Sequence, residues 1–168
     1  MEKRDLADFA EETYKVSARL MALTPNDKLG WRPSSVGNWW TTGQLLYHIT
    51  YSTGGFLRGI PQGRWPEDDD GELRAVSSVA DALEKLEADR RLAAQLLAEL
   101  PDEELRTRKV CGPRPCEPDA PYPLRKCLHH WVLHQAKHQT MLFAYLKLLG
   151  VEPGTAALYD DLAISDSH

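Results

Sequence analysis

Apolar residues recur at intervals of three and four along four stretches of the chain, the spacing that places them on one face of an α-helix. The first stretch covers about 6–23, and its predicted core-facing stripe consists of Leu6, Phe9, Thr13, Val16, Leu20 and Leu23. Thr24 precedes Pro25, and a residue before proline avoids the helical conformation. The first helix is therefore predicted to end there.

The second stretch follows an aromatic loop, NDKLGWRPSSVGNWW, and is predicted to begin at Thr41 or Thr42, either of which can cap a helix. Its predicted inner face comprises Leu45, His48, Ile49, Ser52 and Phe56. The Gly54-Gly55 pair is expected to weaken the later turns, because glycine has a low helix propensity. The glycine and proline within 59–61 are expected to end the helix.

The third stretch spans about 78–100, with an apolar stripe of Val79, Leu83, Leu86, Ala93, Leu97 and Leu100. Ser78 and Asp81 resemble a capping box at its start, and Pro101 closes it. Arg90 interrupts the stripe. It is expected either to extend from the edge of the core toward solvent or to contact an anion in a cavity.

The fourth stretch spans about 124–149 and precedes Gly150, a residue type that commonly ends helices. Four amphipathic helices with little strand signal predict an all-α fold, a four-helix bundle. Two long connections, at 57–77 and 101–123, allow a threading other than simple up-down-up-down. Within the second connection, 107–110 is predicted as a short strand.

Length and composition fit this fold class. The 168 residues are predicted to form one domain, with the bundle at 1–150 and an irregular tail at 151–168. The net charge of −5 and the lack of a basic block argue against nucleic-acid binding. The longest apolar runs fall short of a membrane-spanning helix, and the first residues are charged rather than those of a secretory signal. Neither nucleic acid nor a membrane is expected as a partner.

Three cysteines bear on the compartment, because an odd number without a secretory signal favours a reducing, cytoplasmic location. Cys111 and Cys116 lie five residues apart in CGPRPC, which lacks the C-x-x-C spacing of a zinc ribbon, so both are expected to be loop thiols. Cys127 is expected to be a core thiol. The acidic run in PQGRWPEDDDGE lacks the ligand spacing of a calcium loop and is expected to be solvated.

Three histidines recur every four residues in HWVLHQAKH, within the fourth helix. Residues at i and i+4 share a helix face, so His130, His134 and His138 are predicted to line one stripe that faces the core. A rise of about 1.5 Å per residue separates His130 from His138 by about 12 Å, so one ion cannot bind all three. A neighbouring pair can, as in H-E-x-x-H zinc helices, although the glutamate of that motif is absent.

A third ligand has to come from another helix. Apart from the terminal His168, His48 is the only histidine outside the fourth helix, and it lies on the apolar face of the second helix, in QLLYHI. Each histidine taken alone also fits a packed core residue that makes one hydrogen bond. The histidine pair and the isolated His48 together favour a metal site donated across the bundle.

Two segments resemble the DinB/YfiT-like superfamily. LGWRPSSVGNWWTTGQLLYHI is similar to the family's W-x-P loop and the following helix, which carries a histidine after two apolar residues. HQAKHQTMLFAYLKLLG is similar to its last helix, with two histidines at i and i+4 and a run that ends in leucine and glycine. The order of these two segments and their separation along the chain fit the family across about 1–150. The family often has a paired histidine and an R-G-Q stretch where this chain reads KHQTM from Lys137, which leaves the subfamily open.

The resemblance implies a DinB-like bundle with up-down-down-up threading, often as a homodimer, and a divalent metal held by His48, His134 and His138. Zinc or nickel is the expected metal. The resemblance further implies a metal-dependent enzyme that acts on a small molecule, of the thiol-dependent S-transferase type, with a low-molecular-weight thiol such as bacillithiol or mycothiol. The alternatives are a metal-dependent hydrolase, a non-catalytic stress-related bundle that binds a metal or ligand, and a helical interaction domain without a metal.

Three neutral imidazoles with open positions at the ion are a catalytic type of site. Such an ion can lower the pKa of water for hydrolysis or bind a small thiol as the thiolate. His130, one turn before the pair, is predicted either to support the ligands and carry protons or to pack only. Trp40, Tyr47 and Trp131 are candidate walls of the cavity, and the sequence identifies no general base.

Overall fold

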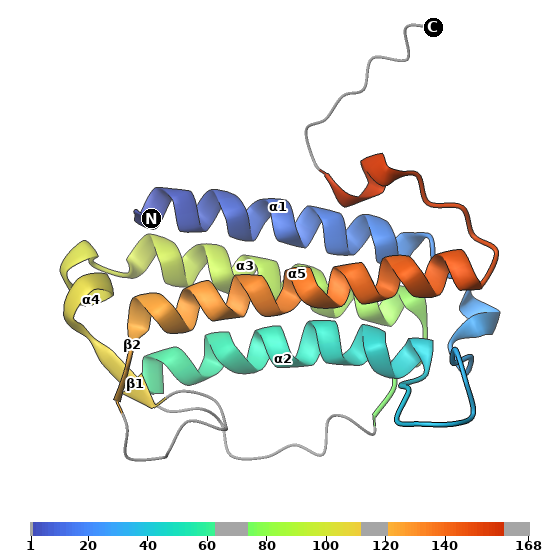
Figure 1. Ribbon diagram of the computed structural model, residues 1–168. Coiled ribbons are helices and arrows are strands. Elements are labelled where there is room, and N and C mark those ends of the chain that lie inside the picture. Colours follow the sequence, from blue (N-terminus) through green and yellow to red (C-terminus); the bar gives the residue numbers. More distant parts are fainter. Residues whose placement is uncertain (1, 63–73, 112–120, 160–168) are drawn as a thin grey trace, which may run out of the picture.

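Four long helices packed side by side make up most of the chain (Figure 1). The computed structural model describes residues 2–62, 74–111 and 121–159. The long helices are α1 (Lys3–Ala22), α2 (Thr42–Gln62), α3 (Val79–Glu99) and α5 (Leu124–Leu148). The prediction of a mainly helical chain is therefore confirmed.

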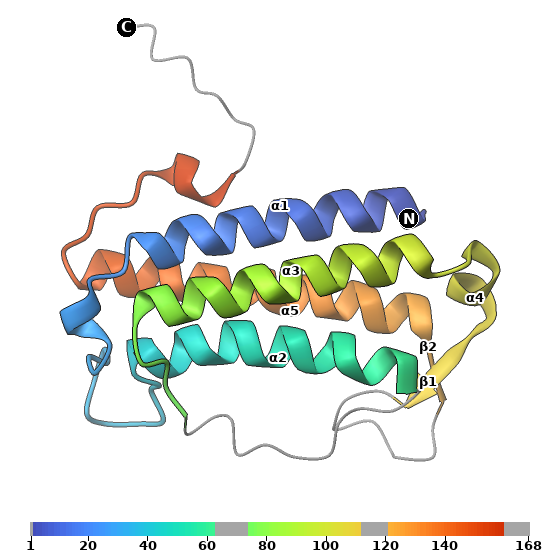
Figure 2. The same ribbon diagram turned by 180° about the vertical axis from the view of Figure 1, so that it is seen from behind.

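Each helix packs against two others. α1 contacts α3 and α5, and α2 contacts the same two helices, so α1 and α2 lie at opposite corners of the bundle. Figures 1 and 2 show α1 and α5 running one way along the bundle and α2 and α3 running the other way. Because α2 and α3 run parallel, α2 ends at the opposite end of the bundle from the start of α3. Residues 63–73 of the connection between them, which contain the acidic run, lie outside the described residues.

The core is built from large apolar side chains of all four long helices. Trp131, Tyr14 and Tyr145 are the largest fully buried side chains, followed by Leu6, Leu20, Met21, Leu45, Leu46, Ile49, Leu57, Leu124 and Leu128. Cys127 is buried among them, as expected. Of the predicted faces, Leu45 and Ile49 of α2 and Leu86, Ala93 and Leu97 of α3 lie in the core. The core also contains residues that were not predicted, namely Leu46, Leu57 and Ile60 of α2 and Ala82 of α3.

The buried face of α1 differs from the predicted stripe. Phe9 is 54% exposed and Leu23 is 40% exposed, so their assignment to the core is wrong. The helix instead buries a face rotated from the prediction, with Leu6, Ala10, Thr13, Tyr14, Val16, Ser17, Leu20 and Met21. The face includes Ser17 because its hydroxyl accepts hydrogen bonds from Gln135 and Gln139 of α5, a pairing that no hydrophobic periodicity reveals. Gln139 also donates to the backbone carbonyl of Thr13.

The ends of the helices follow the predicted capping chemistry. The Ser78 hydroxyl accepts a hydrogen bond of 3.0 Å from the backbone N–H of Asp81, and the Asp81 carboxylate accepts one of 3.1 Å from Ser77 N–H. These bonds satisfy donors that the first turn of α3 leaves open. Gly150 follows α5 with φ of +79°, a conformation that favours glycine, and ends the helix as predicted.

The connection from α3 to α5 contains more structure than a proline-rich loop. It holds a short helix, α4 (Asp102–Thr107), and two antiparallel strands, β1 (Lys109–Cys111) and β2 (Pro121–Pro123). The strand predicted at 107–110 is therefore present, but it begins two residues later and ends one residue later. Cys111 ends this strand, so its assignment to a loop is wrong, because its backbone pairs with Pro121 of β2. Residues 112–120 lie outside the described residues, so a loop position for Cys116 remains a prediction.

The segment after α5 turns back onto α1. Its short 3-10 helix, Thr155–Leu158, follows an extended stretch, and the Arg19 side chain of α1 donates to the carbonyls of Ala156 (3.2 Å) and Tyr159 (2.7 Å). The start of the predicted irregular tail is thus ordered against the bundle, and 160–168 lie outside the described residues. No helix in the described part of the chain has the length and apolar character needed to cross a bilayer.

A glycine in the middle of α2 allows close contact with α3. A Cβ atom added to Gly54 would lie 2.8 Å from a carboxylate oxygen of Asp89 and 2.7 Å from the Arg58 guanidinium, both too close for real atoms. Asp89 is only 8% exposed, on the face of α3 that packs against α2. Gly54 is therefore retained in the helix for packing, despite its low helix propensity.

Gly54→Ala is expected to destabilise the fold by about 1–3 kcal/mol, because the added methyl group displaces the buried carboxylate. In an open helix the same change stabilises by roughly 1 kcal/mol. In an Asp89→Ala background most of the cost is expected to vanish, since the buried carboxylate is gone and the guanidinium of Arg58, at the end of a partly exposed side chain, can move aside. Urea unfolding of the four proteins in this cycle measures both effects. A more stable Gly54→Ala protein with Asp89 intact would contradict this role of Gly54 in packing.

Candidate metal centre

Three histidine side chains from two helices meet between α2 and α5. Nε2 of His48 lies 3.0 Å from Nε2 of His134 and 3.1 Å from Nε2 of His138. One ring nitrogen from each of the three residues lies within 4.8 Å of the others, and all three side chains are partly buried. The structure therefore brings together the three residues that the sequence singled out.

The orientation of α5 is set by polar contacts on its other side. Gln135 and Gln139, each one residue after a histidine of the pair, donate to the Ser17 hydroxyl of α1 at 3.1 and 2.9 Å. Each residue turns an α-helix by about 100°, so neighbouring side chains point in different directions. Because Gln135 and Gln139 point toward α1, His134 and His138 point toward α2. Hydrophobic periodicity gives no sign of these bonds, although the glutamines repeat the i, i+4 spacing of the histidines.

The surroundings keep the imidazoles neutral. Burial lowers the pKa of His48 to about 3, and the neighbouring His138 and His134 rings contribute to the shift. Burial, then His134 and then Lys137 lower the pKa of His138 to about 4. Burial and the Lys137 charge also lower the pKa of His134. Neutral imidazole is the form that binds a metal ion, so these shifts favour metal binding at neutral pH.

Hydrogen bonds among the rings cannot satisfy the cluster. A neutral imidazole nitrogen either carries one proton or offers one lone pair, so Nε2 of His48 cannot make full hydrogen bonds to both partners. Converging lone pairs also repel one another. A cation between the nitrogens removes both problems, because all three lone pairs can then point at one positive centre.

The spacing of the nitrogens fits such an ion. With bonds of about 2.0–2.1 Å, ligands on a tetrahedral ion lie roughly 3.3–3.4 Å apart, and adjacent ligands at right angles lie roughly 2.9–3.0 Å apart. The observed separations from His48, 3.0 and 3.1 Å, fall between these values. Small side-chain movements would therefore suffice for either geometry.

The three candidate wall residues lie in different places. The Trp40 ring lies 4.4 Å from the His48 ring and 5.7 Å from the His138 ring, measured between centroids, so it borders the cluster. Tyr47 instead stacks on Tyr51 at 5.3 Å. Trp131 is fully buried and packs against Tyr14 of α1.

His130 does not share the environment of the other histidines, so its predicted place on a core-facing stripe is wrong. Its side chain is exposed, and its Nδ1 lies 3.2 Å from the hydroxyl of Tyr122 in β2. A step of four residues turns an α-helix by about 40° more than a full turn. His130 lies two such steps before His138, so it is displaced by roughly 80° around the helix axis and lies outside the region between α2 and α5. Its role as a supporting or proton-carrying group remains a prediction without a contact to the three histidines.

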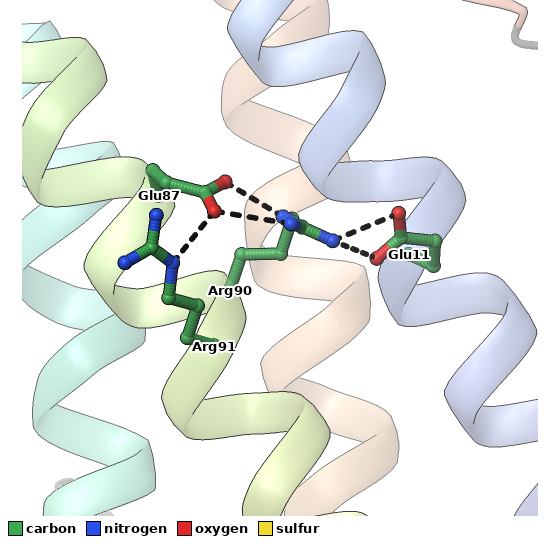
Figure 3. Close-up of polar contacts among 4 residues, drawn as sticks. All are labelled: Glu11, Glu87, Arg90 and Arg91. Atoms are coloured by element: carbon green, nitrogen blue, oxygen red, sulfur yellow. Dashed lines mark hydrogen bonds and ion pairs between the residues drawn. The ribbon is translucent and has the colours of Figure 1, made fainter.

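Arg90 lies at the groove between α1 and α3, where its guanidinium binds carboxylates of the protein itself (Figure 3). Its guanidinium donates to both oxygens of Glu11 on α1, at 3.1 and 3.0 Å, and to Glu87 at 2.7 and 3.0 Å. Arg91 shares the Glu87 carboxylate at 2.9 Å. All four side chains are more than a third exposed, so these ion pairs are expected to add little to the free energy of unfolding.

Solved structures and a family profile are similar to this chain. A DinB-like protein from Bacillus subtilis has a similar fold, with a TM-score of 0.68 and 17% identity, over 89% of this chain and 94% of that one. A DinB-like protein from Bacillus cereus also gives a TM-score of 0.68 and 17% identity, over 86% and 91% of the two chains. No protein of curated function matches. The sequence profile of the DinB superfamily matches residues 10–142, most of the chain, so the chain belongs to the DinB superfamily.

Proposed function

We propose that the protein binds one divalent metal ion through His48, His134 and His138 and uses it to act on a small molecule. The observation that carries the proposal is the convergence of three neutral imidazole nitrogens, from two helices, within 4.8 Å of one another. Three nitrogen ligands leave coordination positions free, which is typical of catalytic rather than structural sites. Zinc or nickel suits imidazole ligands.

The chemistry that we favour is thiol-dependent S-transfer. A divalent ion at such a site lowers the pKa of a coordinated thiol or water and so supplies a nucleophile at neutral pH. The chain's own residues favour an anionic partner, since the three imidazoles are neutral and Lys137, exposed beside them, is positive. A low-molecular-weight thiol such as bacillithiol or mycothiol is the proposed cofactor.

Two other functions stay open as alternatives. A metal-dependent hydrolase would use the same histidines and activate water instead of a thiol. A non-catalytic bundle, such as a stress-related sensor, would bind the metal or a ligand without turnover. The partly buried position of the cluster, between two helices, supports access by small molecules in each case.

The assembly and location that we propose follow the family resemblance. The up-down-down-up threading is supported by the helix directions in Figure 1. A homodimer is supported by the exposed Phe9 of α1 and by a groove of about 410 Å³ between α1 and α3 that alanines help to line. A cytoplasmic location agrees with the buried thiol of Cys127.

Titrating the cobalt-loaded protein with 2-mercaptoethanol tests the preferred chemistry. We expect a new near-ultraviolet absorption band from the thiolate, release of a proton, and neither signal in His134→Ala. Assays with an activated aryl halide and with an activated ester then distinguish transfer to the thiol from hydrolysis. Cobalt binding without a thiolate band would contradict the thiol proposal, and ester cleavage alone would favour the hydrolase.

A further inference from the structure

The indole of Trp40 covers one side of the histidine cluster. It is tilted by 46° to the His48 ring at 4.4 Å and stacks on the His138 ring at 5.7 Å with an angle of 27°. It thus contacts one ligand from each of the two helices. A flat ring in this position occupies space that a molecule approaching the converging nitrogens would otherwise use.

The backbone around Trp40 is fixed. The Tyr145 hydroxyl of α5 donates to the Trp40 carbonyl at 3.1 Å. The next residue, Thr41, forms a reciprocal cap with Gln44, since its N–H donates to the amide oxygen at 2.8 Å and its hydroxyl accepts from Gln44 N–H at 3.2 Å. Trp40 is therefore tied to α5 on one side and to the first turn of α2 on the other.

Tyr145 is itself fixed by aromatic packing. Its ring is fully buried and lies 5.6 Å from the Trp31 ring, edge to face, and 6.3 Å from the Trp39 ring. These contacts join the aromatic loop before α2 to the end of α5. Together these contacts hold the backbone of Trp40 in place, and the Trp40 ring itself is held by its contacts with the His48 and His138 rings.

We propose that Trp40 is a specificity-determining residue, a fixed wall that limits the width of a ligand beside the atom that joins the three histidines, whatever the length of the rest of the molecule. The inference rests on the proposed metal site and adds a substrate class to it, thiols without a bulky group next to the sulfur. Trp40 blocks the side of His48 and His138 that faces the start of α2. Lys137, next to His138 in the chain, is exposed and can meet the charge of an anionic ligand.

The test compares two thiols of similar chemistry and different size, 2-mercaptoethanol and phenylmethanethiol, by titration into the cobalt-loaded protein. Trp40→Ala is expected to raise the affinity for phenylmethanethiol relative to that for 2-mercaptoethanol by about tenfold, because removing the wall gives the aromatic group room. Trp40→Phe, which keeps a smaller ring, is expected to shift the ratio less. Trp39→Ala is the matched control, because it removes the neighbouring indole, which packs on Tyr145 rather than on the histidines, and it is expected to change the ratio less than Trp40→Ala does.

The outcomes separate this inference from the proposed function. An unchanged ratio in Trp40→Ala, or an equal change in Trp39→Ala, would overturn the role of Trp40 while cobalt binding still supports the metal site. Absence of cobalt binding in the unmodified protein would overturn the metal site itself, and the inference with it. If Trp40→Ala fails to fold, the ratio in Trp40→Phe decides the question, and no change there overturns the inference.

Discussion

His48→Ala is expected to lower the affinity for zinc by more than the roughly 100-fold that loss of a residue supporting a ligand costs. The substitution removes the one of the three converging nitrogens that comes from α2 and leaves the pair on α5. His134→Ala is expected to have an effect of similar size. Competition with a zinc-binding dye measures the affinity of each variant.

His130→Ala is the matched control for these variants. It removes an imidazole from the same helix, but the side chain is exposed and contacts Tyr122 rather than the cluster. Its zinc affinity is expected to equal that of the unmodified protein. An equal loss in His130→Ala and His48→Ala would contradict the assignment of ligands.

Asp89→Asn is expected to make the protein more stable above pH 7, by up to about 4 kcal/mol. Burial raises the pKa of Asp89 to about 7 from an ordinary value of 3.8, and the Arg58 guanidinium, 3.9 Å away, offsets this only in part. Between these pH values the folded chain binds a proton that the unfolded chain releases. The free energy of unfolding of the unmodified protein therefore falls as pH rises from about 4 through 7.

The histidine cluster changes the free energy of unfolding with pH in the opposite direction. The pKa values of His48 and His138 lie below 6.5 in the folded chain, so without a metal they favour unfolding as pH falls. The difference between Asp89→Asn and the unmodified protein isolates the carboxyl group, because the histidines are common to both. Urea unfolding with a chelator at pH 5, 6, 7 and 8 measures it, with the exposed Asp8→Asn as control. Parallel pH profiles would contradict a raised pKa for Asp89.

The features that the sequence predicts well depend on local chemistry. The cap at Ser78 and the stop at Gly150 follow from hydrogen bonds and a backbone angle within a few residues. The pairing of His134 and His138 follows from helix geometry alone. His48 could be added because an isolated histidine interrupts the apolar stripe of the second helix, and the pair on the fourth helix needs a third ligand.

The features that the sequence predicts poorly depend on how helices are rotated in the bundle. Hydrophobicity assigns Phe9 to the core, but α1 turns Ser17 inward to meet Gln135 and Gln139. The rotation of α5 that points these two glutamines toward α1 leaves His130 exposed. The buried Asp89 escapes prediction because it fits the helical spacing but not the apolar pattern, and Gly54 across from it supplies the space.

Metal content of the protein, purified without a histidine tag and measured by elemental analysis after dialysis against zinc, tests the central claim most directly. The three converging imidazoles predict about one equivalent of zinc per chain in the unmodified protein, and loss of that metal in both His48→Ala and His134→Ala. No bound metal in the unmodified protein, after zinc, nickel and manganese have each been offered, would contradict the claim and leave the three histidines as packing residues.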